Sequence, residues 1–318
     1  MTAERKYLYG PVPSRRLGLS YGVDIVPLKI CTLDCVYCQL GRSIRKTVER
    51  KEYVPVEPVL AELSEALTDG SEADFITIAG SGEPTLNSRL GELIDGIKHL
   101  TDIPVAILTN GTLLYRQDVR ADCAKVDVAL PSLDAGDEQT FKKIDRPHPT
   151  ISIETVISGL CSFRQEFAGQ IWLEVFFVDS INTGPEQIAK IKDAIRRIRP
   201  DKVQLNTAIR PTAESNVVKL DAGKLHDIAK QLGPECEVVA DFSTEPSDED
   251  ALGLNCATRS KTQTLLSMLK RRPCSLCDLC TGLAISETEV LRHISELEQG
   301  GLISSERKGG KVFFKALS

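Results

Sequence analysis

Three cysteines lie within eight residues of one another, a spacing typical of metal centres. Cys31, Cys35 and Cys38 belong to the run Cys-Thr-Leu-Asp-Cys-Val-Tyr-Cys. Soft thiolates select iron–sulfur clusters, and three of them hold three irons of a [4Fe–4S] cube while the fourth iron stays open. An open iron binds a ligand from outside the protein, so this spacing predicts a reactive, oxygen-labile cluster.

A structural zinc loop is the alternative interpretation of these cysteines. Zinc sites usually combine two neighbouring ligands with two distant ones, and no histidine lies within sixty residues of Cys38. No Ser/His/Asp triad and no glycine-rich phosphate loop competes for a catalytic role. The only histidines, His99, His148, His226 and His293, are scattered along the chain. The pattern therefore favours cluster chemistry over zinc binding or histidine catalysis.

With Tyr37 in the aromatic position, the signature Cys-x3-Cys-x-aromatic-Cys resembles that of the radical S-adenosylmethionine (SAM) enzymes. The segment Gly80-Ser-Gly-Glu-Pro-Thr resembles the glycine–glutamate–proline segment with which that family binds the methionyl amino group. The likeness extends over about residues 7–235. A winged-helix tail is also found in related proteins.

The resemblance implies two cofactors, a [4Fe–4S] cluster and SAM, and an electron donor such as flavodoxin or ferredoxin. SAM would chelate the open iron through its amino and carboxylate groups. The reduced cluster would then cleave the sulfonium to a 5′-deoxyadenosyl radical, which abstracts a substrate hydrogen. Because the cofactors supply this chemistry, the protein has to position the reactants and exclude water. No catalytic side chain is assigned.

Flanking residues resemble a narrower branch related to the wyosine-type tRNA-modifying enzymes. They are the runs Tyr-Gly-Pro-Val-Pro-Ser-Arg-Arg-Leu-Gly at 9–18 and Cys-Gln-Leu-Gly-Arg at 38–42. Wyosine synthases carry a second cluster on upstream cysteines, whereas no cysteine precedes Cys31 here. The branch implies RNA as the substrate.

Short apolar runs alternate with helical patterns, which predicts parallel strands joined by crossover helices. We expect strands at residues 23–26, 75–79, 105–109, 126–130, 171–178 and 202–206, and helices at 58–67, 90–100, 153–167 and 185–198. The fold class is α/β, a partial (βα)6 barrel. Right-handed crossovers bring the carboxyl ends of all strands to one side.

The motifs follow the predicted strands on the side where α/β barrels build their sites. From the resemblance, Glu83 faces the ammonium group of SAM, while Ser132 and Thr109 hold its carboxylate. Each residue also has a local interpretation, as in a turn or a bond to nearby backbone. The predicted cofactor contacts are Tyr37, Gly80, Gly82, Glu83, Thr109, Asn110, Ser132 and Asn206.

The net charge of −6 hides an uneven distribution. Residues 1–60 and 257–318 each carry ten Lys/Arg against six Asp/Glu, so the centre of the chain is acidic. The densest basic patch, residues 42–51, follows the cluster loop and would hold phosphates at the rim of the site. A solvated loop is the alternative. The tentative substrate contacts are Arg15, Arg16, Arg42, Arg45, Lys46 and Arg210.

A polar, acidic run at 243–256 predicts a linker between two domains, residues 1–242 and 257–318. In the second domain, helices predicted at 258–270, 276–283 and 286–299 and a hairpin at 302–317 outline a winged helix. Ser286 is the expected N-cap of the third helix, and Glu289 would close a capping box.

The third helix of this tail carries four glutamates against one arginine. A net negative helix is poorly suited to a DNA groove lined by phosphates. The wing, with Arg307, Lys308 and Lys311, is better suited to an RNA backbone. Because every predicted SAM contact lies before residue 211, we expect the tail to select the substrate without taking part in SAM cleavage.

Further cysteines in the tail have ligand-like spacing. Cys274, Cys277 and Cys280, with Cys256, would form a second cluster, but an apolar helical stripe gives Cys280 a core position. A helix also spreads residues spaced by three over roughly 120° of its surface. We therefore favour buried or surface thiols here. Small core residues are predicted for Cys123, Cys161 and Cys236.

The remaining composition indicates a cytoplasmic protein with an ordinary core. The 318 residues suffice for two domains, and 42% of them are apolar. No apolar run approaches the roughly 18–20 residues that span a bilayer, and the first residues are charged. Ten cysteines without an export signal indicate metal ligation or buried thiols rather than disulfides.

Three functions are compatible with these features. The first is a radical SAM enzyme that acts on RNA, favoured by the basic ends and the narrower resemblance. The second is a radical SAM enzyme that modifies a peptide or protein, or activates a partner enzyme, favoured by the acidic helix of the tail. The third is an iron–sulfur regulator that senses redox state and signals through the winged helix, which would leave the barrel motifs without a use.

Overall fold

The computed structural model describes residues 5–68, 73–240, 261–283, 285–308 and 310–317. The linker predicted at 243–256 lies outside these described residues, and so does Cys256. Within them, no helix combines the length and apolar character that a membrane span requires.

The larger part of the chain is built on one eight-stranded sheet with the order β1-β2-β5-β6-β7-β8-β9-β10. Its strands are β1 (Leu8–Ser14), β2 (Gly18–Val23), β5 (Phe75–Ile78), β6 (Val105–Thr109), β7 (Val128–Pro131), β8 (Gln170–Phe177), β9 (Lys202–Thr207) and β10 (Cys236–Val238). All neighbours from β2 to β10 are parallel, and β1 is antiparallel to β2. The predicted partial barrel is confirmed, with an extra strand at each edge.

The first predicted strand is wrong in its bounds. We expected residues 23–26, but β2 ends at Val23. The apolar run after Val23 is buried without sheet pairing, because Ile25 and Val26 pack into the core beneath the cluster loop. Burial, and not strand structure, explains why these residues are apolar.

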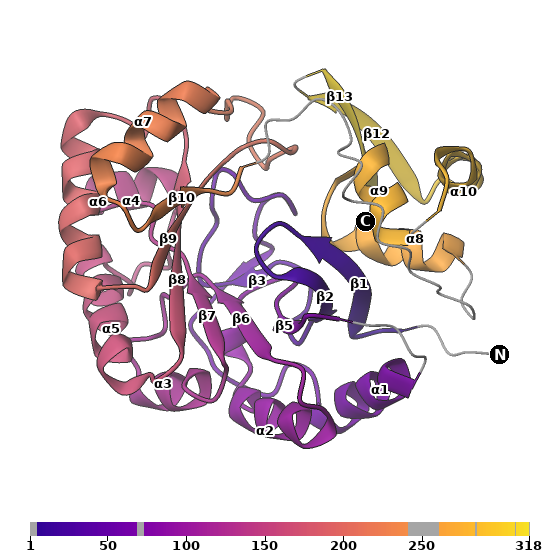
Figure 1. Ribbon diagram of the computed structural model, residues 1–318, viewed down its shortest axis with the longest axis horizontal. Coiled ribbons are helices and arrows are strands. Elements are labelled where there is room, and N and C mark those ends of the chain that lie inside the picture. The colour runs from indigo at the N-terminus through magenta and orange to yellow at the C-terminus, as the bar shows by residue number, and fades with distance from the viewer. Residues whose placement is uncertain (1–4, 69–72, 241–260, 284, 309, 318) are drawn as a thin grey trace.

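Helices cover one face of the sheet, as Figure 1 shows. They are α1 (Val56–Thr68), the short 3-10 helix η1 (Pro84–Leu86), α2 (Leu90–Leu100), α3 (Gln117–Cys123), α4 (Glu138–Ile144), α5 (Ile153–Glu166), α6 (Pro185–Ile198) and α7 (Ala222–Leu232). In α2 the predicted stripe of Leu90, Leu93, Ile94 and Ile97 is at most 1% exposed. Burying such a stripe against the sheet is what fixes an amphipathic helix.

The tail is a winged helix, as predicted. It contains α8 (Lys261–Arg271), β11 (Cys274–Ser275), α9 (Leu276–Leu283), α10 (Glu287–Gln299), β12 (Ile303–Lys308) and β13 (Lys311–Ala316), with the sheet order β11-β13-β12. Ser286 caps α10, since its Oγ accepts a bond from the backbone N of Glu289 at 3.3 Å. The carboxylate of Glu289 pairs with Lys261 at 2.9 Å.

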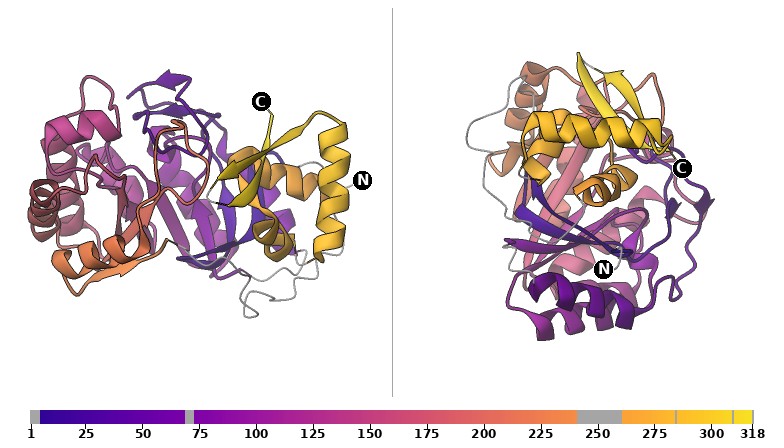
Figure 2. Two further views of the ribbon diagram at one scale, coloured as in Figure 1. Left: turned by 90° about the horizontal axis from the view of Figure 1, so that it is seen from above. Right: turned by 90° about the vertical axis from the view of Figure 1, so that its right-hand side faces the viewer.

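The tail packs directly on the edge of the barrel sheet. Val12 of β1 is 7% exposed and belongs to the apolar core of the winged helix, and Tyr9 packs against the same core. Both views in Figure 2 place the yellow tail beside the indigo N-terminal strands. The core of the winged helix is therefore completed by a strand from the other end of the chain.

Candidate active site

The cluster loop lies between β2 and α1 and includes two very short strands, β3 (Ile30–Cys31) and β4 (Arg45–Lys46). The backbone N of Thr47 donates to the carbonyl of Cys31 at 2.9 Å, and that of Cys38 to the carbonyl of Cys35 at 3.2 Å. Cys35 and Cys38 line a cavity of about 930 Å³. The loop thus holds two of the three predicted thiols at one cavity wall.

These thiols fit an iron–sulfur cluster better than a single ion. Among the described residues, no three His, Cys, Asp or Glu side chains converge as the ligands of one metal ion do. A four-iron cube does not need that convergence, because each thiolate binds a different iron. Burial and the nearby Glu83 raise the pKa of the Cys31 thiol to about 12. Metal ligation is what would favour the thiolate in this setting.

The two glycines of the segment 80–85 serve close packing within the protein. Gly80 has φ of +148°, and a Cβ there would lie 2.4 Å from Cγ of Asp24. A Cβ on Gly82 would lie 2.1 Å from the carbonyl oxygen of Ile30. We predicted both as ligand contacts; of the two, Gly80 lines the cavity, while Gly82 lets the segment pack against the cluster loop.

Glu83 is 2% exposed, and its carboxylate is surrounded by donors from the protein. Its Oε1 accepts bonds from the hydroxyls of Thr85 and Thr109, both at 2.6 Å. Its Oε2 accepts a bond from the backbone N of Asn110 at 2.8 Å. We expected this carboxylate to face an ammonium group; in the structure it joins the loops after β5 and β6.

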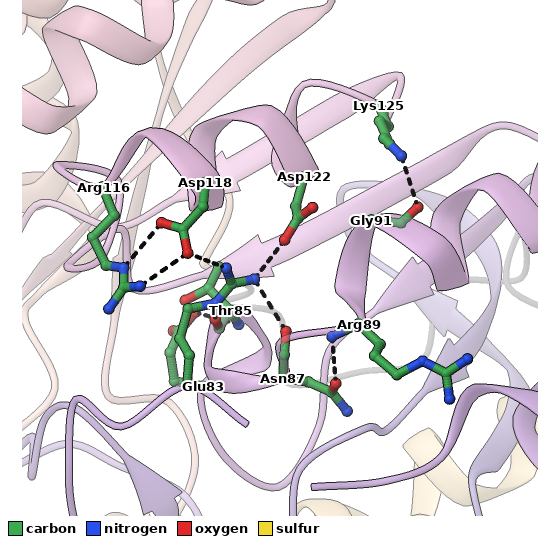
Figure 3. A network of polar contacts seen from close by, with 10 residues as sticks. Glu83, Thr85, Asn87, Arg89, Gly91, Arg116, Asp118, Asp122 and Lys125 are labelled. Atoms are coloured by element: carbon green, nitrogen blue, oxygen red, sulfur yellow. Dashed lines mark hydrogen bonds and ion pairs between the residues drawn. The ribbon is translucent and has the colours of Figure 1, made fainter. Parts of the chain in front are cut away.

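The side chain of Arg50, which belongs to the basic patch at 42–51, binds the same segment. Its guanidinium donates to the carbonyls of Thr85 and Asn87 at 2.9 and 3.2 Å. It also pairs with Asp118 and Asp122 of α3 at 2.7 and 2.5 Å. Figure 3 shows these acceptors beside Glu83. Arg50 is therefore a structural residue rather than a phosphate contact.

Asn110 reaches a predicted cluster ligand. Its Nδ2 lies 3.5 Å from Sγ of Cys31 and 2.8 Å from Oγ1 of Thr32, while its Oδ1 accepts bonds from Thr112. Such a donor to a ligating sulfur influences the reduction potential of a cluster. Ser132, which we assigned to the SAM carboxylate, borders a separate small void of about 10 Å³.

An aromatic pair lines the cavity beside the cluster loop. The rings of Tyr37 and Phe176 are stacked, with centroids 3.9 Å apart and an interplanar angle of 11°. The Tyr37 hydroxyl donates to Asp134, and the Phe176 backbone N donates to the same carboxylate at 2.7 Å. Burial raises the pKa of Asp134. The carboxyl group thus fixes both rings of the pair.

Asn206 also lines the cavity, where its Nδ2 donates to Glu174 at 2.9 Å. Glu174 in turn pairs with Arg16 at 3.0 Å. Although burial opposes ionisation, Arg16 and Asn206 hold the pKa of Glu174 below its ordinary value. The sequence analysis missed Glu174 and Asp134; the signal available for Glu174 is an acid inside an otherwise apolar strand.

The predicted substrate residues separate into two groups. Arg15, Arg16 and Arg210 all line the cavity. Arg42 forms ion pairs with Asp34 and Glu214, each at 2.8 Å, and its side chain is 60% exposed. Arg45 and Lys46 are exposed as well, and neither is among the described lining residues. The patch at 42–51 therefore does not form the cavity wall.

The winged helix supplies the opposite wall, which the sequence did not predict. Its residues at the cavity are Arg271, Arg272, Ser275, Cys277, Asp278, Thr281, Lys308, Lys311 and Phe313. Two ion pairs join the domains here, Arg210 with Asp278 at 2.8 Å and Arg271 with Asp24 at 3.6 Å. Asp24 also accepts a 2.5 Å bond from Ser81, so the tail is linked to the segment 80–85.

The tail cysteines occupy three different environments. Cys274 is fully buried in the winged-helix core, Cys280 is half-buried against it, and Cys277 is exposed at the cavity. In the barrel, Cys123 is buried, and Cys161 and Cys236 are half-buried against the core. The tail thiols thus have different surroundings, and the preference for thiols over a second cluster stays a prediction.

Comparisons with known proteins extend these observations. The model of the radical SAM superfamily matches residues 25–198, and that of the arsR family of bacterial regulatory proteins matches residues 263–305. Streptococcus suis SuiB, solved with bound S-adenosylmethionine, superposes with a TM-score of 0.54 at 17% identity, over 73% of this chain and 54% of SuiB. At that identity the likeness shows a shared fold.

Two curated relatives match almost the whole chain. A protein of Brachyspira hyodysenteriae named GTPase Obg is 37% identical over 309 residues, which are 97% of this chain and 45% of that protein. A UPF0026 protein of Helicobacter pylori is 31% identical over 313 residues, which are 97% of this chain and 97% of that protein. The chain thus spans less than half of the first relative and nearly all of the second.

Proposed function

Because this chain belongs to the radical SAM superfamily, we propose that it is an enzyme that cleaves SAM reductively and abstracts a hydrogen atom from RNA. Membership implies SAM and an iron–sulfur cluster as cofactors. We assign a [4Fe–4S] cluster to Cys31, Cys35 and Cys38 because three thiolates leave one iron open. The observation that carries the proposal is the placement of Cys35 and Cys38 at a large cavity.

When bound, the cluster and SAM supply the electron and the radical that react. The residues of this chain position them. Tyr37 and Phe176, held by Asp134, offer an apolar face beside the cluster loop. Glu83 accepts hydrogen bonds from Thr109 and Asn110 and so holds the loop after β6 against the loop after β5. The winged helix lines the cavity from the other side and reduces the surface through which water reaches it.

The charge of the cavity supports an anionic substrate such as RNA. Eight Lys/Arg and two Asp/Glu residues line it. A cavity with walls of one sign raises the local concentration of oppositely charged ligands. Flavodoxin or ferredoxin is the class of electron donor that we propose for the cluster.

A peptide or protein substrate is the second candidate, and the exposed glutamates of α10 favour it. An iron–sulfur regulator that binds DNA fits less well. Lys308 of the wing donates to Thr212 and to the carbonyl of Val217 at 3.1 and 3.3 Å, so it faces the barrel rather than a DNA backbone.

The proposal is tested with reduced, cluster-loaded protein and SAM, to which RNA or protein fractions are added. We expect RNA to raise the formation of 5′-deoxyadenosine above the uncoupled rate, and ribonuclease treatment of the fraction to abolish the increase. Stimulation by the protein fraction alone would support the second candidate. The identity of RNA that copurifies anaerobically would narrow the substrate.

A further inference from the structure

Four arginines from three distant parts of the chain, three in the barrel and one in the winged helix, line the cavity. Arg15 and Arg16 lie in the turn between β1 and β2, Arg210 follows β9, and Arg272 follows α8. Burial together with the charges of Arg210, Arg16 and Arg272 lowers the pKa of Arg15. We call these four residues the arginine cluster.

Two members of the arginine cluster are neutralised by carboxylates. Arg16 pairs with Glu174 at 3.0 Å, and Arg210 pairs with Asp278 at 2.8 Å. Arg210 is only 8% exposed. Burial opposes ionisation of Asp278, but Arg210 and Arg272 lower its pKa to about 2. These two pairs therefore account for both acids that line the cavity.

The other two members form no ion pair of their own in the part of the chain that the structure describes, although Arg272 shares the electrostatic attraction of Asp278 with Arg210. Arg15 donates to the neutral carbonyl of Val239 at 2.9 Å, and neither it nor Arg272 has an ion pair with a carboxylate of the described residues. Lys308, at the same cavity, also bonds only to neutral oxygens within the described chain. The arginine cluster thus has a formal excess of two positive charges, with a third close by.

Excess charge of one sign in a cavity is unfavourable unless a counter-charge joins it. The guanidinium fork matches the oxygens of a phosphate, to which it donates paired hydrogen bonds. A phosphate monoester carries roughly −1.5 to −2 charges at neutral pH, which is close to the excess on the arginine cluster. A carboxylate would neutralise only half of it.

We propose that the arginine cluster binds a phosphate monoester of the substrate, which is then a mononucleotide or the 5′-phosphorylated end of an RNA held between the barrel and the winged helix. The proposal rests on the proposed function for its place in catalysis, whereas the phosphate site itself does not depend on the cluster. Typical ligand pockets measure roughly 300–1,000 Å³. The cavity of about 930 Å³ therefore suits SAM together with one further unit of modest size, and a double helix does not fit.

The test is calorimetric titration of the full chain with inorganic phosphate, adenosine 5′-monophosphate and a short single-stranded RNA that carries a 5′-phosphate. Wild-type protein should bind the mononucleotide or the RNA saturably, and more weakly as salt increases. Arg15→Met and Arg272→Met should each weaken this binding roughly 10-fold or more, by removing charge-assisted hydrogen bonds. Arg196→Met is the matched control, because Arg196 is exposed on α6 and pairs only with Asp193 among the described residues.

Two further readouts keep the outcome clear. If Arg15→Met does not fold, Arg15→Lys keeps the charge and loses the fork, and it should show an intermediate affinity. Preference for the mononucleotide over the RNA, or the reverse, identifies the source of the phosphate. The proposal is overturned if wild-type protein binds none of the three probes, or if both Met variants bind as tightly as Arg196→Met.

The same titration on protein with Cys31, Cys35 and Cys38 replaced by Ala separates this inference from the proposed function. Retained phosphate binding in that variant shows that the anion site stands without the cluster. If wild-type protein then failed to cleave SAM, the proposed function would fall and the phosphate site would remain.

Discussion

The two walls of the cavity differ in how their polar groups are satisfied. The motif wall is lined by Cys35, Tyr37, Cys38 and Gly80, and among the motif residues that do not reach the cavity, the Glu83 carboxylate and the Asn110 amide are bonded within the protein. On the arginine cluster, two guanidinium groups have no carboxylate partner among the described residues. The polar groups of the motif residues thus have hydrogen-bond partners without a ligand. The arginine cluster instead carries excess positive charge that an anionic ligand would neutralise. Preorganisation suits a fixed cofactor site, and excess charge suits an exchanging substrate.

The largest effect should come from removing the thiols of the cluster loop. Replacing Cys31, Cys35 and Cys38 together by Ala should abolish iron and sulfide binding, because it removes all three proposed thiolate ligands of the cluster. Iron and acid-labile sulfide per chain, measured after anaerobic reconstitution, provide the check. Cys161→Ala is the matched control, since Cys161 is half-buried against the outer core. Four irons retained in the triple variant would refute the assignment.

The next largest effect concerns Glu83. Its removal in Glu83→Ala leaves the buried donors of Thr85, Thr109 and Asn110 without an acceptor, so we expect the free energy of unfolding to fall by about 3 kcal/mol. Urea unfolding of the cluster-free protein measures this, with the exposed Glu186→Ala as control. Unchanged stability together with a roughly 10- to 150-fold loss of SAM affinity would instead place Glu83 at the ligand.

A smaller effect should follow from loss of the ion pair between Arg210 and Asp278, which joins the barrel to the winged helix. The folded-state pKa of Asp278 is about 2, below its ordinary 3.8, so the Asp278 carboxylate stabilises the fold above about pH 4 and loses that contribution as the pH falls through 2. Asp278→Asn should therefore cost about 1–2 kcal/mol of unfolding free energy at pH 7, and the difference should shrink as the pH falls from 4 towards 2. Asp227→Asn on α7 is the exposed control. A pH-independent difference would show that the loss is steric.

The smallest effect is expected at Asn110. Its amide donates towards Sγ of Cys31, and a donor to a ligating sulfur stabilises the reduced, more negative cluster. Asn110→Ala should lower the reduction potential by roughly 20–60 mV, which corresponds to one ordinary hydrogen bond. Potentiometric titration of the reconstituted protein gives the value. A potential that rises would exclude this role for the amide.

Much of the fold was predictable because its signals are local. The helices at 90–100 and 185–198 have the predicted bounds, since an apolar stripe marks each one. β1 was missed because Gly10, Pro11 and Pro13 argue against a strand, yet an edge strand tolerates proline. Its packing on the tail is a long-range contact, which no local pattern contains.

The sequence predicted many of the residues that belong to the site, but not the direction in which their side chains point. It predicted Glu83 as a ligand contact and placed Arg50 in a basic patch, but whether a side chain faces a ligand or its own backbone depends on the tertiary fold. Arg271 and Arg272 were missed for a different reason. Basic residues at a helix C-terminus are expected from the helix dipole alone, so their place at the cavity carried no separate signal.

The most direct test of the account is whether the reconstituted, reduced protein cleaves SAM. We expect wild-type protein and Cys161→Ala to form 5′-deoxyadenosine and methionine in equal amounts, slowly without substrate, as measured by liquid chromatography. The protein with Cys31, Cys35 and Cys38 replaced should form neither product. A wild-type protein that binds its full complement of iron and binds SAM, yet forms no 5′-deoxyadenosine on reduction, would contradict the account.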